Sequence, residues 1–168
     1  MKENIREWIN NFVSKSNPDL NGFAPCPYAS KALADNKVDI IAGTTPERDA
    51  LLLKNADFNN LDVKVFVYDP EIFNPDDFSN RIQMINQSLH DEDLLVLDDH
   101  PKSEEIIKGV KMNQGEFALM FVQVLSRLDD AAEKLAKRGY YDGWPEDYLC
   151  ELFKGRKDPR LWYTNTVE

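Results

Sequence analysis

Three short apolar runs that alternate with helix-start signals constrain the fold of this chain more than any other feature. The runs are KVDIIAG at 37–43, DVKVFVYD at 62–69 and DLLVLDD at 93–99. Thr45 and Asn74 follow the first two runs, and each is a helix-capping residue type followed directly by proline, which suits the first helical position. Strands joined by helices of this length generally run parallel. The pattern predicts an α/β fold with a small, mainly parallel sheet of three or four strands layered by helices.

The third run is almost continuously apolar. A strand covered by helices on both faces has this composition, so we expect DLLVLDD to be the central strand. The segment IIKGVKM at 106–112 fits either a fourth strand or a helical turn. Because its pairing is open, a ferredoxin-like α+β arrangement is the alternative fold.

Two other segments carry apolar residues at helical spacing. Residues 2–15 are expected to form an amphipathic helix. A longer helix is expected from about Gln114 to Arg138, ending at Gly139 and packing against the sheet or a second copy of itself. Its apolar stripe consists of Phe117, Phe121, Val124, Leu128, Ala131 and Leu135.

A chain of 168 residues with 42% hydrophobic residues is close to the usual size of one domain, so we expect residues 1–168 to form a single α/β domain. Its C-terminal segment, 140–168, is rich in aromatic residues, most of which also have polar tips. These are Tyr140, Tyr141, Trp144, Tyr148, Phe153, Trp162 and Tyr163. Such a segment either folds back over the sheet as a lid or forms a contact face for a partner.

Charge and cysteine content restrict the partners and the compartment. Thirty acidic residues against twenty basic ones give a formal charge of −10, which has the wrong sign for binding nucleic acid. Cys26 and Cys150 are the two cysteines, and no apolar leader or span of membrane length is present in the sequence. These features predict a cytoplasmic protein without membrane partners.

Polar residues follow the expected strands at their carboxyl ends, where ligands bind in open parallel sheets. Asp98, Asp99 and His100 end the third run, and Asp69 ends the second. One imidazole beside carboxylates can act as an acid–base pair or hold a cation. We therefore consider His100, Asp98 and Asp99 as catalytic candidates, and all four residues as candidate metal ligands. Helix caps and turns also favour Asp, so a purely local role is the alternative.

Cys26 lies between two prolines in the stretch APCPYAS. As a structural residue it would be a small buried hydrophobe. As a nucleophile it would gain thiolate character from the N-terminus of a helix beginning near Pro27. A glutaredoxin-like redox role is not favoured, because Ala29 stands where that motif has its second cysteine.

The order of several short motifs resembles an uncharacterised bacterial domain family over about residues 5–101. Trp8 is followed by CPYA at 26–29 and by a later strand closing on His100 and Pro101. The family has a tryptophan before Cys-Pro-Phe-Ala and a later His-Pro. The resemblance implies Cys26, Pro27, His100 and Pro101 as site residues. It supplies no reaction, and the family's later Asn-Arg-Ser-Pro segment is absent from this chain.

Two functions fit these observations. The first is an enzyme acting on a small molecule, with Cys26 as nucleophile or ligand, His100 as acid–base group, and Asp98 or Asp99 orienting the imidazole. The second is a non-catalytic binding or assembly protein that uses the aromatic C-terminal segment and can form homo-oligomers. The sequence does not identify a cofactor.

Overall fold

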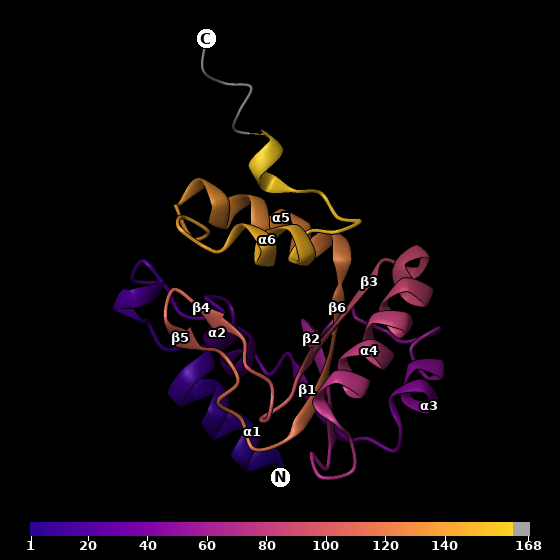
Figure 1. The fold of residues 1–168 in the computed structure, drawn as a ribbon. Helices are drawn as coiled ribbons and strands as arrows, with labels where there is room; N and C mark the ends of the chain where they lie inside the picture. The colour runs from indigo at the N-terminus through magenta and orange to yellow at the C-terminus, as the bar shows by residue number, and fades with distance from the viewer. Residues whose placement is uncertain (163–168) are drawn as a thin grey trace.

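The structure, a computed structural model, describes residues 1–162 and contains a four-stranded sheet between two layers of helices (Figure 1). The strands lie in the order β1 (Val38–Ala42), β2 (Val63–Tyr68), β6 (Ala118–Val124) and β3 (Leu94–Asp99). β1 pairs with β2 in parallel, whereas β6 is antiparallel to both β2 and β3. The predicted α/β fold is therefore confirmed, although most pairings are antiparallel, as in the α+β alternative.

The run DLLVLDD forms β3, an edge strand, so the prediction of a central position was wrong. Leu94 and Val96 pack in the core beneath α4, and Leu95, which points to the opposite face, is also buried. A continuously apolar run thus indicates that both faces of a strand are covered. It does not indicate that both of its edges are paired.

Helices α3 (Pro46–Leu51) and α4 (Pro75–Leu89) cover one face of the sheet (Figure 1). Each begins at the residue that the sequence indicated. The Thr45 side chain accepts a hydrogen bond from the backbone N–H of Arg48, and the Asn74 side chain accepts from those of Asp76 and Asp77. α4 buries Phe78, Ile82, Ile85 and Leu89 against β2, β3 and β6.

The other face is covered by α1 (Lys2–Trp8), by the π-helix η1 (Ile9–Val13) that continues it, and by α2 (Ala29–Ala34). The predicted amphipathic helix over residues 2–15 is confirmed in position. Ile5 and Ile9 carry its apolar face onto the sheet, where they pack with Val65 and Leu119.

The predicted helix over 114–138 was wrong in its first half. Residues 118–124 form β6, and α5 (Leu125–Lys137) begins only where Ser126 donates two hydrogen bonds to the carboxylate of Asp93. Phe117, Phe121 and Val124 match helical spacing, but every residue between them is also apolar or small except Gln123. Both faces of β6 are covered, and two strands pair with its edges, so the strand satisfies this run better than a helix would.

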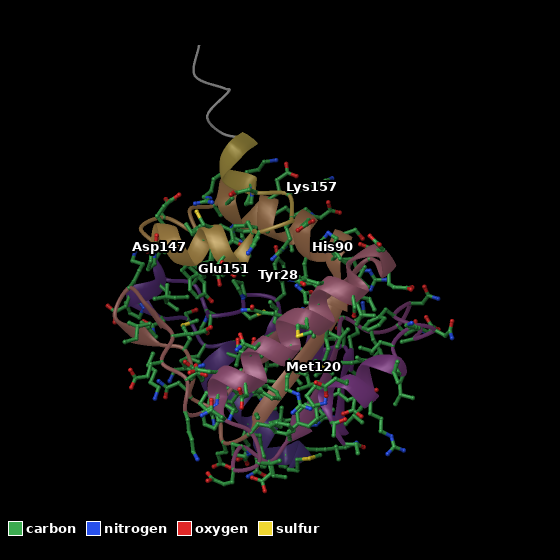
Figure 2. All side chains as sticks on the ribbon, turned by 45° about the vertical axis from the view of Figure 1, so that its right-hand side comes forward. Tyr28, His90, Met120, Asp147, Glu151 and Lys157 are labelled. Atoms are coloured by element: carbon green, nitrogen blue, oxygen red, sulfur yellow. The ribbon has the colours of Figure 1, made fainter. Side chains whose placement is uncertain are left out.

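A third apolar cluster lies beyond the sheet and contains most of the aromatic C-terminal segment. The hairpin β4 (Ile106–Ile107) and β5 (Val110–Lys111) packs there with α5, α6 (Glu146–Leu152) and the short 3₁₀-helix η2 (Pro18–Leu20). Tyr140, Trp144 and Phe153 are buried in this cluster, whereas Asp147 and Glu151 are exposed on α6 (Figure 2). The segment therefore folds back onto α5, the hairpin and η2, and the described members of this cluster include no residue of the four main strands, so it does not form the expected lid over the sheet.

Three details complete the fold. IIKGVKM is neither a strand of the main sheet nor a helical turn, because it forms its own two-stranded hairpin. Two further 3₁₀-helices are present: η3 (His90–Glu92) lies between α4 and β3, and η4 (Pro159–Trp162) follows α6. Tyr163 lies outside the described residues. No helix within residues 1–162 is long and apolar enough to cross a membrane.

Candidate functional site at the carboxyl edge of the sheet

The topology brings the carboxyl ends of β1, β2 and β3 to one edge of the sheet. β6 is antiparallel to β2 and β3, so these two strands run in the same direction, and β1 is parallel to β2. The chain then leaves β3 through His100, makes the β4–β5 hairpin, and returns through residues 113–117 into the start of β6. The polar residues after β3 and those before β6 therefore meet at this edge.

Asp98 and Asp99 point to opposite faces of β3. Asp98 pairs in register with Met120, whose side chain is in the core under α4, and it accepts a hydrogen bond from Ser79 of that helix. Asp99 pairs with Leu119, which faces α1. Burial raises the pKa of both carboxyl groups, to about 6 for Asp99.

His100 is fully buried on the α4 side of the sheet, beside the ring of Phe78. The backbone N–H of Lys102 donates to its Nδ1 over 3.1 Å, which requires that nitrogen to be unprotonated. Nε2 therefore carries the proton and donates to the carbonyl oxygen of Phe73, also over 3.1 Å. Both ring nitrogens are used to fix the local backbone. Its predicted acid–base role stays a prediction, and this geometry favours a structural role.

On the opposite face, Asp99 is held by a buried amide. Asn113 Nδ2 donates to Asp99 Oδ1 over 2.6 Å, and Asn113 Oδ1 accepts from the backbone N–H of Glu105 over 2.7 Å. The bond from the Glu105 N–H shows which end of the Asn113 amide carries the oxygen, and so fixes the orientation of the amide. Asn113 thus ties the start of the hairpin to its end and fixes the plane of the Asp99 carboxyl group.

The other carboxyl oxygen of Asp99 and the indole nitrogen of Trp8 lie near the same backbone position. Asp99 Oδ2 and Trp8 Nε1 are both buried, and neither has a hydrogen-bond partner among the described residues. Both atoms approach the same point, which is the position that a Cβ on Gly115 would occupy: Trp8 Nε1 lies 3.6 Å from it and Asp99 Oδ2 lies 3.7 Å from it. A buried donor and a buried acceptor therefore lie within 4 Å of one spot beside the bare backbone of Gly115, and both lack the partners that buried polar groups nearly always have.

The surroundings of this spot carry negative charge. Partial burial, followed by the charges of Asp98 and Asp99, raises the pKa of Glu105 to about 7, although its side chain is exposed to water. Tyr148 of α6 also has a raised pKa, first because it is buried and then because Glu105 and the two aspartates are close. The negative charges at this edge of the sheet therefore also act on α6.

Cys26 lies in a different part of the structure. Its backbone N–H donates to the carbonyl oxygen of Val13, and Tyr140 and Tyr141 are close to its thiol. The N–H groups of Tyr28 and Ala29 lower the thiol pKa, as expected at the start of α2, but burial of the sulfur raises it by more. Cys26 is on the α1–α2 side of the sheet and His100 is on the α4 side, so the structure does not bring the predicted pair together.

The four residues considered as metal ligands are also separated. Asp69 is exposed and accepts a hydrogen bond from the N–H of Glu71, so it acts as a turn residue after β2. Within residues 1–162, no group of three or more His, Cys, Asp and Glu side chains is placed to hold a metal ion. The geometry gives the predicted metal site no support.

Comparisons with protein-family models, with curated proteins and with solved structures found no match. The resemblance of residues 5–101 to a bacterial domain family therefore stays a prediction. Of the site described above, sequence reasoning identified Asp99 but missed Asn113 and Gly115, which lie at or just before the start of the expected helix. Trp8 had a signal, because it is the tryptophan of the resemblance, but Asn113 and Gly115 had none.

Proposed function

We propose that this protein is a cytoplasmic enzyme that binds a small hydroxyl-bearing molecule above Gly115, where Asp99 exchanges a proton with the bound hydroxyl group. One observation carries the proposal: Asp99 Oδ2 and Trp8 Nε1 are buried without partners among the described residues and face the same spot. A hydroxyl group is the smallest group that can accept from the indole N–H and donate to a carboxylate at the same time. The cytoplasmic location rests on the two free cysteines.

The chemistry follows from the two orphan atoms. In its ionised form Asp99 accepts a hydrogen bond from the hydroxyl group, and it takes up that proton and becomes a neutral carboxylic acid as the ligand's oxygen forms a new bond. The N–H of Trp8 donates to the same oxygen and stabilises the negative charge that develops there in the transition state. A carboxyl group with a pKa of about 6 gains and loses its proton near neutral pH, which suits a group that must both take up and release a proton. Asn113 is a positioning residue, because it holds the carboxyl plane.

The test uses the indole N–H of Trp8 as a reporter in ¹H–¹⁵N correlation spectra. Serine, glycerol and ribose serve as hydroxyl-bearing probes, and alanine is the matched compound that lacks the hydroxyl group. The Trp8→Phe variant assigns the reporter peak, and the peaks of Trp144 and Trp162 serve as internal references. We expect at least one hydroxyl-bearing probe to shift the Trp8 peak, and alanine to leave it in place.

Gly115→Ala is the matched variant, because its new Cβ would lie at ordinary contact distances of 3.6 and 3.7 Å from the two orphan residues. The variant should fold, but its methyl group occupies the proposed site, so the shift should disappear. An equal shift in both proteins, or no shift with any probe, overturns the proposal. So does a stability loss of more than about 1 kcal/mol in Gly115→Ala without any probe effect, because a structural water would then pair the two atoms.

The alternative function, a binding protein that uses its aromatic C-terminal segment, is not favoured by this geometry. Tyr140, Trp144 and Phe153 are buried inside the third apolar cluster and cannot form an outer contact face.

A further inference from the structure

A groove between α3 and α4 lies outside the site described above. The two helices lie side by side on one face of the sheet (Figure 1), and the groove between them has a cavity volume of about 240 Å³. Its lining combines apolar side chains with three charged ones. From α3 and the turn after it come Glu47, Ala50, Leu51 and Lys54; α4 contributes Arg81, Met84, Ile85, Ser88 and Leu89.

The rim of this groove exposes large apolar side chains. Leu51 is 67% exposed and Met84 is 71% exposed, and both line the groove. Single exposed apolar residues are ordinary, but two that line one largely apolar groove form a patch of the kind that marks an interaction site. The patch is separate from the carboxyl-edge site, so nothing below depends on the proposed function.

The charges on α3 indicate which partner fits. Glu47, Leu51 and Lys54 all line the groove, so they form a stripe with an acid at one end, leucine in the middle and a base at the other end. Glu47 is bound by Arg81 of α4 through two hydrogen bonds of 2.6 and 2.7 Å. Lys54 has no ion-pair partner among residues 1–162 that the structure describes.

Such a stripe is complementary to itself when two copies meet in antiparallel orientation. The Lys54 side chain of each copy then meets the Glu47 carboxylate of the other, and Leu51 meets its counterpart at the two-fold axis. The chain as a whole is strongly acidic, with a formal charge of −10, so most other faces of two copies repel each other. We propose that the α3–α4 groove is the contact face of an isologous homodimer with Leu51 at its centre.

The size of the contact face indicates how tightly the two copies should bind each other. A standard interface contributes about 20 to 30 residues from each side, whereas nine residues line this groove. We therefore expect a weak dimer in equilibrium with monomer, and not an obligate one.

The test is sedimentation equilibrium of the full chain at concentrations from about 10 μM to about 1 mM, the range in which an interface smaller than standard associates. We expect the average mass of the wild type to rise toward that of a dimer. Leu51→Glu places two like charges at the axis and should remain monomeric throughout. Ile106→Glu is the matched control, because Ile106 is 56% exposed but lies on the β4–β5 hairpin, and it should associate like the wild type.

A second variant tests the charge pairing. Lys54→Glu leaves the apolar patch intact but places the introduced carboxylate against Glu47 of the other copy, so it should weaken association about tenfold or more at low salt, with a smaller effect at high salt. Circular dichroism checks that each variant is folded. A wild type that stays monomeric to about 1 mM overturns the proposal, as do equal effects of Leu51→Glu and Ile106→Glu.

Discussion

Asp99→Asn should change the pH dependence of stability in a characteristic way. Burial raises the pKa of Asp99 from its ordinary value of 3.8 to about 6 in the folded protein. The folded state therefore binds this proton more tightly than the unfolded state does. The stability associated with the protonated group is fully present below pH 3.8 and is lost as the pH rises through 6.

The magnitude follows from the difference in proton affinity. Each tenfold difference is worth about 1.4 kcal/mol, so ionisation of Asp99 costs the folded state about 3 kcal/mol by pH 7. The introduced asparagine carries no charge and still accepts the hydrogen bond from Asn113, but its amide NH₂ replaces Oδ2 and faces the N–H of Trp8. Two donors facing one spot cost about 1 kcal/mol. We expect the variant to be about 2 kcal/mol more stable than the wild type at pH 7.

Below pH 4 the order should reverse, because wild-type Asp99 is then neutral while the mismatch in the variant persists. Urea unfolding between about pH 3 and pH 8 measures both free energies, and taking their difference removes the pH dependence that the two proteins share. Glu104→Gln, which removes an exposed charge from the same loop, should give a profile parallel to that of the wild type. A constant difference between Asp99→Asn and the wild type over this range would refute the reasoning.

Three further outcomes are expected. Gly43→Ala should lose about 2 kcal/mol or more, because its Cβ would overlap the ring of the buried Tyr68; thermal unfolding that matches the wild type would contradict this contact. His100→Leu should cost about 2–3 kcal/mol in urea unfolding, because two backbone groups lose their partners, and a cost below about 0.5 kcal/mol would exclude a structural role. In native protein the exposed Cys150 should be alkylated quickly and Cys26 slowly, because burial raises the pKa of the Cys26 thiol. Cys150→Ser should therefore remove the fast phase of alkylation, and a fast phase that remains would show a reactive Cys26.

The parts of the fold that depend on local chemistry could be predicted from sequence. Thr45 and Asn74 accept hydrogen bonds from N–H groups two or three residues away, so their capping role is decided within one helical turn. The strand β6 could not be predicted in this way. Phe117, Phe121 and Val124 fit a helix by spacing alone, and only the distant strands β2 and β3, which pair with it, decide the conformation.

The candidate site divides in the same manner. Asp99 was found because it ends an apolar run, and the ends of such runs meet at one edge of a sheet. Its importance depends on Trp8 and Gly115, which are far from it in sequence and reach it only through the packing of α1 and the return of the chain from the hairpin. No local sequence pattern predicts that Trp8, Asp99 and Gly115 come together.

The late position of β6 in the chain also has a consequence for biosynthesis. β2 and β3 do not pair with each other; each pairs with β6, whose residues follow them by at least 19 positions. While the ribosome has made only the first hundred residues, the central place in the sheet is empty, and two apolar strands expose unpaired backbone edges. Such edges recruit other chains, so fragments that end before Ala118 should aggregate, and the nascent protein depends on rapid completion of its last strand to stay in solution.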